Sequence, residues 1–170
     1  MRSGFYSFIN MNNDRYVEIR NDPDYKVFKF VSEGRHGNLT KIVRFDKLRQ
    51  RNNTFNLALG TELNDGEVDF TGITNNGDRN KILATVAKIV YTVTEKHPEM
   101  DIYVTGSDSR RTLLYQRAII YAYDELTETF NIYGVLTNDD MIDYEPFDQS
   151  KNYLGLLIER KGVNDEQLVY

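Results

Sequence analysis

Four segments between residues 25 and 74 are rich in aromatic and β-branched residues, and short turns separate them. Phe55, Leu57 and Leu59 alternate with small or polar residues, as they do in a strand that buries one face. Turns this short, at 34–38 and 64–66, connect antiparallel neighbours. The sequence therefore predicts a four-stranded antiparallel meander, formed by residues 25–32, 39–48, 54–61 and 67–74.

An amphipathic helix is predicted at about residues 79–96, directly after the meander. Asp78 is a suitable N-cap, and Pro98 prevents the helix from continuing. Lys81 and Lys88 fall on its polar side. Apolar residues recur at intervals of three and four, namely Ile82, Leu83, Val86, Ile89, Val90 and Val93. We expect this stripe to cover the sheet.

The second half of the chain alternates strand and helix patterns. In chain order it predicts a strand at 100–105, a helix at 109–125, and two strands at 130–136 and 153–158. The fold class is therefore α+β: a four-stranded antiparallel meander packed by a helix, then a strand, a second helix and two further strands.

The length of 170 residues, with 40% apolar content, suits one ordinary domain. We place this domain at residues 25–160, with an N-terminal extension at 1–24 and a loosely held tail at 161–170. The chain has no cysteine, no run of apolar residues that could span a bilayer, and no secretory signal pattern. These features favour a cytoplasmic protein without membrane partners.

Charge is strongly segregated along a chain whose net charge is −5. Between Lys26 and Arg51 the balance is +6, whereas between Asp124 and Asp148 it is −8. Such blocks affect association more than fold. The two blocks could face each other, pair between subunits of a homo-oligomer, or bind partners of opposite charge.

The strand-to-helix connection at 105–111 is a candidate anion site. Unpaired amide groups at a helix start attract anions, and glycine permits close approach to the backbone. The residues expected to bind the anion are Gly106, Ser107, Ser109, Arg110, Arg111 and Arg117. The alternative is a well-capped helix with solvated arginines. Neither a Walker A pattern nor a GxGxxG pattern is present, so no nucleotide is specified.

The basic meander is a candidate nucleic-acid surface. Lysine and arginine residues lie among aromatic residues there, a combination that single-strand binders use. The residues expected to contact nucleic acid are Lys29, Lys41, Arg44 and Lys47. Strand alternation leaves a second interpretation open, in which Phe28 and Phe30 belong to the core.

The sequence gives little support for catalysis, a metal or a cofactor. His36 and His97 lie far apart and have no partnered nucleophile. The acidic run that includes Asp139 and Asp143 does not match an EF-hand loop. We therefore assign no catalytic residue, no metal ligand and no cofactor.

Several phrases in this sequence resemble an uncharacterised family of small bacterial proteins common in Bacteroidota. They include Lys81 to Ala87, Thr105 to Ser107 and Arg111 to Tyr115, and the resemblance extends from about Tyr25 to Tyr153. It implies a single bacterial domain and no particular activity. The order of elements is also similar to the ββββα units of Whirly and Pur single-strand-binding folds, although fold alone does not decide function.

Our leading expectation is a non-catalytic binding module for an anionic ligand, with single-stranded nucleic acid first among the candidates. The main rival is a protein-interaction or dimerising module that uses the acidic and basic blocks. An enzyme is the third hypothesis.

Overall fold

The computed structural model describes residues 14–72, 74–137 and 140–162. They form an α+β fold in which one mostly antiparallel sheet carries three helices, which confirms the predicted class. The strands are β1 (Arg20–Asn21), β2 (Val27–Gly34), β3 (Gly37–Lys47), β4 (Thr54–Glu62), β5 (Val68–Asp69), β6 (Asp101–Val104), β7 (Phe130–Thr137), β8 (Asp143–Pro146) and β9 (Gly155–Arg160). The helices are α1 (Arg79–Lys96), α2 (Ser109–Tyr121) and α3 (Tyr123–Thr129).

The sheet has the order β1-β2-β3-β4-β6-β9-β7-β8, with β5 paired to β4. Strands β2, β3 and β4 form the first three strands of the predicted meander. The fourth is much shorter than predicted, because β5 contains only two residues. Oδ1 of Asp69 accepts hydrogen bonds from the amides of Thr71 and Gly72, and this turn takes the chain away from β4.

Helix α1 spans the residues that the apolar stripe predicts. The second predicted helix is divided at Ala122 into α2 and α3. Ala122 and Leu126 are both buried, so the turn at Ala122 lets α3 follow the core. The short strands β1 and β8 were not predicted.

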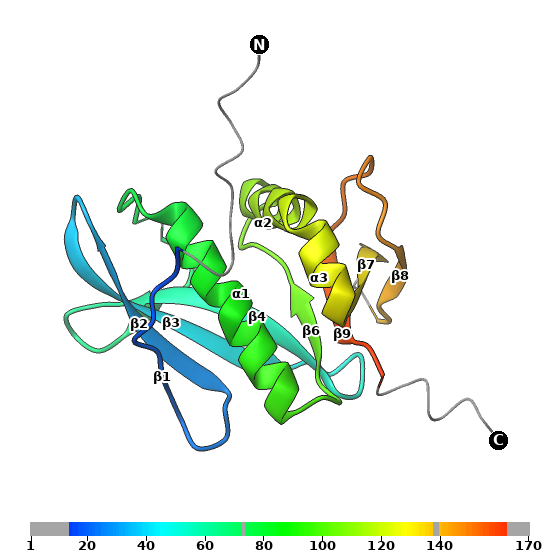
Figure 1. The fold of residues 1–170 in the computed structure, drawn as a ribbon, viewed down its shortest axis with the longest axis horizontal. Coiled ribbons are helices and arrows are strands. Elements are labelled where there is room, and N and C mark those ends of the chain that lie inside the picture. The colour runs from blue at the N-terminus through cyan, green and yellow to red at the C-terminus, as the bar shows by residue number, and fades with distance from the viewer. Residues whose placement is uncertain (1–13, 73, 138–139, 163–170) are drawn as a thin grey trace, which may run out of the picture.

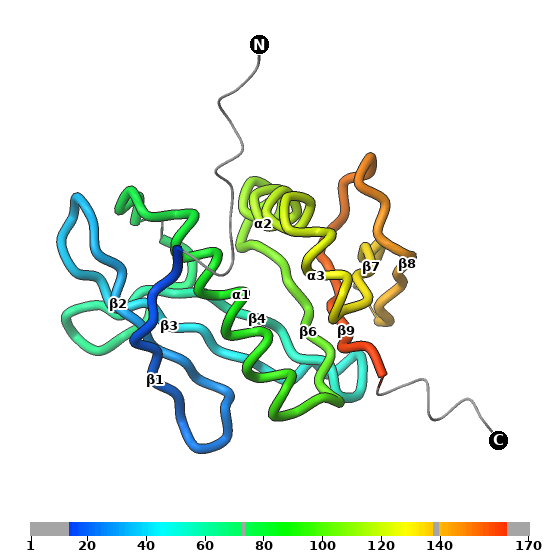
Figure 2. Tube along the Cα trace, viewed as in Figure 1, coloured from blue at the N-terminus to red at the C-terminus, as the bar shows by residue number. Residues whose placement is uncertain are grey.

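Both ends of the sheet share one core beneath the helices. Helix α1 crosses in front of β3 and β4, and α2 and α3 lie beside it on the same face (Figure 1, Figure 2). Phe28, Phe30 and Phe45 lie in this core, as the alternation allowed. A smaller cluster of Tyr103 and its neighbours packs on the opposite face. None of the described helices has the length and apolar character needed to cross a bilayer.

Part of the predicted N-terminal extension packs on the sheet. The ring of Tyr16 lies 5.6 Å from that of Phe30, measured between centroids, and β1 pairs with β2. Most of the predicted tail, residues 163–170, lies outside the described residues, as do residues 1–13 and Asp139.

Asp101, at the start of β6, should make stability depend on pH. It is 8% exposed, and Arg51 donates a hydrogen bond of 3.1 Å to its carboxylate. Burial raises the pKa of this carboxyl to about 6, although Arg51 acts in the opposite direction. The folded protein therefore binds this proton more tightly than the unfolded chain, and Asp101 lowers stability as pH rises through this pKa.

We predict that Asp101→Asn is more stable than the wild type near neutral pH, by on the order of 1–3 kcal/mol. The difference should largely disappear near pH ~3, where the carboxyl is mostly protonated in both states. Urea unfolding at several pH values measures it. Stability curves that run parallel across this range would contradict the prediction.

Candidate functional site

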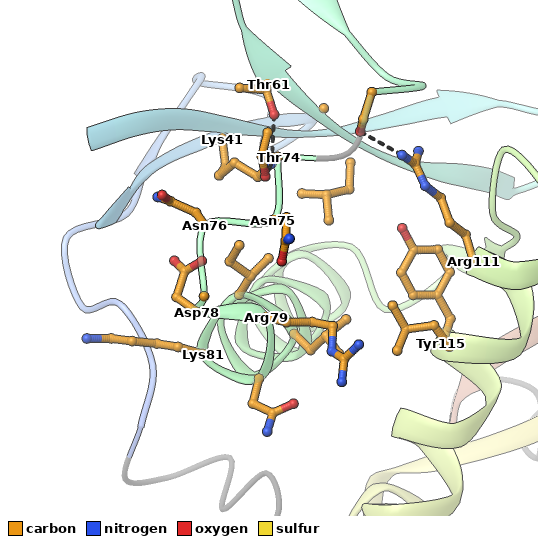
Figure 3. Close-up of a pocket in the computed structure, with 18 of the residues that line it drawn as sticks. Lys41, Thr61, Thr74, Asn75, Asn76, Asp78, Arg79, Lys81, Arg111 and Tyr115 are labelled. Carbon is orange, nitrogen blue, oxygen red and sulfur yellow. Dashed lines mark hydrogen bonds between the residues drawn. The ribbon is translucent and has the colours of Figure 1, made fainter. Parts of the chain in front are cut away.

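A cleft of about 900 Å³ lies between the start of α1, the first three turns of α2 and the segment 69–78. Strands β3 and β4 close its inner side (Figure 3). The volume is within the range of small-molecule sites. Six lysine or arginine residues and four aspartates line the cleft, so its charge is net positive although the chain is acidic.

Lys41 is the most deeply buried cation of the cleft. The residue is 6% exposed, and its Nζ donates hydrogen bonds to Thr61 Oγ1 at 2.7 Å and Thr74 Oγ1 at 3.3 Å (Figure 3). Within the described part of the chain, no carboxylate oxygen lies within 4.0 Å of this ammonium. Burial lowers the pKa of Lys41, and the nearby charge of Asp78 partly offsets this. A buried ammonium without an ionic partner attracts an anion.

The first turn of α1 also faces the cleft. Asp78 occupies the N-cap position that the sequence predicts, but its side chain makes no capping hydrogen bond. Its Oδ2 accepts hydrogen bonds from Tyr16 at 2.5 Å and Ser32 at 2.6 Å instead. The side chain therefore leaves the first backbone amides of α1 uncapped, and these belong to residues that line the cleft.

The segment before α1 is held by the tip of the β2–β3 hairpin. Asn76 is buried, and its side chain bonds to the amide of His36, the hydroxyl of Ser32 and the carbonyl of Gly37. A Cβ atom at Gly34 would lie 1.8 Å from the carbonyl oxygen of Asn76, so only glycine permits this approach. The hairpin thus fixes the position from which α1 starts.

Arg111 is occupied by the backbone of the 70–72 segment. Its guanidinium donates hydrogen bonds to the carbonyls of Phe70 at 3.2 Å, Thr71 at 2.6 Å and Gly72 at 2.6 Å. Figure 3 shows Arg111 reaching from α2 toward this segment. The same segment bonds to Asp69 Oδ1, and these amide donors lower the pKa of Asp69. Arg111 therefore joins α2 to one side of the cleft.

The predicted anion-binding turn is tightly packed against α2. The side chain of Asp108 accepts a hydrogen bond of 2.9 Å from the amide of Arg111, and the amide of Gly106 donates to Thr112 Oγ1 at 2.9 Å. Ser107 Oγ accepts from Arg111, whereas Ser109 is exposed. This helix start is thus capped by an acidic residue of its own, and anion binding at the turn itself stays a prediction.

The structure brings Arg110, Arg111 and Arg117 together with Lys41, which the sequence had assigned to a different surface. Arg110 and Arg117 are exposed, as is Arg79 from α1. Among the described residues, no carboxylate lies within 4.0 Å of these three guanidinium groups. Arg79, Arg110 and Arg117 are therefore exposed cations of the cleft that could contact an anion.

The other predicted nucleic-acid residues do not share one face. Lys29 and Arg44 lie on the face opposite the helices, and each pairs with a carboxylate, Glu62 at 3.0 Å and Asp46 at 2.8 Å. The Arg44 guanidinium also lies 4.4 Å from the centroid of the Phe70 ring. Lys47 is exposed at the end of β3. Only Lys41 belongs to the cleft.

The acidic residues after β7 form no metal site that the structure shows. No group of three or more potential ligands occurs among the described residues. Glu145 accepts hydrogen bonds from Lys151 and Tyr153, and these donors lower its pKa. Asp148 bonds to Ser150.

Sequence reasoning missed several cleft residues, including Thr61, Thr74, Arg79 and Tyr115. One feature of the sequence could have pointed to the cleft, namely the position of Lys41 in its strand. Lys41 occupies a strand position with the same parity as Val43 and Phe45, so a charged residue interrupts an otherwise apolar face. The contacts of Thr61 and Thr74 depend on chain segments far apart and leave no local pattern.

Residues 12–161 of this α+β protein match the model of a family described as "Family of unknown function (DUF6934)". The chain belongs to that family, which confirms the resemblance to an uncharacterised family. The restriction to Bacteroidota stays an expectation. Neither the curated proteins nor the solved structures contain a match.

Arg111 and Arg110 should differ in their effects on stability. Arg111→Ala removes three hydrogen bonds to carbonyls, and we expect a loss on the order of 1–2 kcal/mol together with faster amide exchange at Thr71 and Gly72. Arg110→Ala, the matched control from the same turn, should leave both unchanged. Thermal unfolding and hydrogen exchange measure the effects, and equal behaviour of the two variants would contradict this role of Arg111.

Proposed function

We propose that the protein binds a compact anionic ligand, bearing a phosphate or carboxylate group, in the cleft between α1 and α2. The carrying observation is Lys41, a buried ammonium bonded to two hydroxyls and to no carboxylate among the described residues. An ammonium has three donors, so one remains for a ligand. The uncapped start of α1 supports the same proposal, because helix amides favour anions.

Three of the four aspartates of the cleft compete little for these cations. Asp69 accepts amide hydrogen bonds, Asp78 bonds to Tyr16 and Ser32, and Asp108 caps α2. Each of these three carboxylates is therefore engaged by neutral donors, while Arg79, Arg110 and Arg117 have no carboxylate partner among the described residues. An anion would complete this arrangement.

Single-stranded nucleic acid fits the geometry less well. Stacking platforms need aromatic side chains beside accessible cations, but Phe28, Phe30 and Phe45 are buried and Lys29 and Arg44 are paired. A compact anion needs only the cleft. Nucleic-acid binding stays an alternative hypothesis, and a low-salt gel shift tests it.

Replacing Lys41 should weaken phosphate binding without lowering the stability of the fold. We predict that Lys41→Met weakens binding of inorganic phosphate by about 10- to 100-fold, because a charge-assisted hydrogen bond is lost. Stability should stay the same or rise, since an apolar side chain replaces a desolvated ammonium. Titration calorimetry and thermal unfolding measure both quantities.

Lys29→Met is the matched control, because Lys29 lies on the other face of the sheet. It should leave phosphate affinity unchanged at moderate salt. If wild-type protein does not bind phosphate, or if both variants bind it as the wild type does, the proposed site is wrong.

Protein interaction is a second candidate function, supported by the region around β8. Among the strands of the described residues this one ends the sheet, and no other described strand pairs with its outer edge. Exposed apolar side chains accompany it, with Met141 at 78% and Tyr144 of β8 at 39% exposure. Asp140 and Asp143 add negative charge there.

If this acidic region binds a basic surface on a second copy of the chain, the double variant Asp140→Lys and Asp143→Lys should shift the protein from dimer toward monomer, because the reversed charges repel that surface. Light scattering after size exclusion measures the mass. A wild-type monomer across the accessible concentration range would rule out self-association at this edge.

A further inference from the structure

We propose that the ligand of the cleft is an amphiphilic anion, with a charged head near Lys41 and a short apolar tail that enters the protein between α1 and α2. This inference rests on the proposed anion site and specifies the chemical class of its ligand. It depends on a second cavity that adjoins the cleft.

An apolar cavity of about 80 Å³ lies beneath α1 and α2, over strands β4, β6 and β9. Leu57, Val90 and Phe130 are among the apolar side chains around it. A space lined almost entirely by apolar side chains offers water few hydrogen-bond partners and suits an apolar group. The protein therefore has an apolar pocket, partly open to the surface, between the helices and the sheet.

The cleft and the apolar cavity share three lining residues, Leu59, Leu83 and Tyr115. A group that passes these side chains moves from the cationic cleft into apolar surroundings. Figure 3 shows Tyr115 on α2 facing the cleft, across from Arg79 and the segment before α1. The two spaces are thus adjacent compartments of opposite character.

Tyr115 suits the boundary between the two compartments. Its ring lines the apolar cavity, while burial raises the pKa of its phenol, so the hydroxyl stays neutral and can donate a hydrogen bond. Among the described residues, the structure gives this hydroxyl no hydrogen-bond partner. A ligand oxygen next to the apolar tail is a suitable acceptor.

The size of the apolar cavity limits the tail. A dry cavity of about 150 Å³ holds a benzene ring, so 80 Å³ suits roughly three to four carbon atoms. Leu83 and Tyr115 would contact the carbons that lead there from the cleft. A long acyl chain does not fit without rearrangement of the core.

Isothermal titration of the full chain with inorganic phosphate and with methyl, butyl, hexyl and dodecyl phosphate tests this inference. We expect affinity to rise by about three- to fourfold for each methylene from methyl to butyl phosphate, and to level off beyond hexyl phosphate. The matching alkanoates show whether a carboxylate head serves equally. Hexanol, which lacks the charge, should bind at least tenfold more weakly than hexyl phosphate.

Two variants fill the apolar cavity from different helices, Ala118→Leu on α2 and Ala87→Leu on α1. Whichever of them retains cooperative thermal unfolding should bind phosphate like the wild type but lose the gain from the longer tail. If neither folds, a change in the side-chain methyl signals of Leu83 and Val90 on adding hexyl phosphate, absent with methyl phosphate, gives the same information by nuclear magnetic resonance.

The outcomes separate this inference from the proposed function. Equal affinity for phosphate and all alkyl phosphates overturns the apolar tail and leaves the anion site standing. Chain-length dependence that persists in a folded cavity-filled variant, or tight hexanol binding, also overturns it. If none of the phosphates or alkanoates binds, both proposals are wrong.

Discussion

One parallel pair of strands determines where the cleft lies. β4 and β6 run in the same direction, whereas every other strand pair described here is antiparallel. A parallel connection needs a crossover, and α1 supplies it. Both α1 and α2 then start beyond the carboxyl ends of this pair, the position where ligands gather in parallel sheets. The rest of the sheet supports this arrangement without creating a second such position.

The cleft of this acidic protein is net positive, and three of its four carboxylates form hydrogen bonds with neutral groups and do not pair with the nearby cations. Asp69 and Asp108 accept hydrogen bonds from backbone amides and Asp78 accepts them from hydroxyls, so these side chains hold loops and the start of α2 instead of pairing with cations. Arg111 is likewise bound to carbonyl groups. Net charge per residue block therefore describes this molecule poorly, because hydrogen bonding decides which charges remain available in the cleft.

Local patterns predicted the elements well and the site only in part. The apolar stripe predicted α1, and alternation predicted β2 to β4, because burial imposes these periods within a few residues. The shortening of β5 depends on one side-chain turn at Asp69, and β8 forms only by pairing with β7. Arg110, Arg111 and Arg117 were selected as a group, but their association with Lys41 depends on contacts between distant segments. Such contacts have no signature in a single sequence.

The bonds of Asn76 have a consequence for any molecule that enters between the helices. On one side of the cleft, Asn76 bonds the segment before α1 to the β2–β3 hairpin. On the other side, Arg111 bonds α2 to the turn after β5. A molecule that enters the cleft would therefore order little additional backbone. Most of the loss of backbone conformational entropy at this site occurs when the protein folds, before anything binds. Binding of the proposed anion in such a preorganised cleft would depend chiefly on the match of shape and charge, because the backbone would adjust little to a poorly matched molecule.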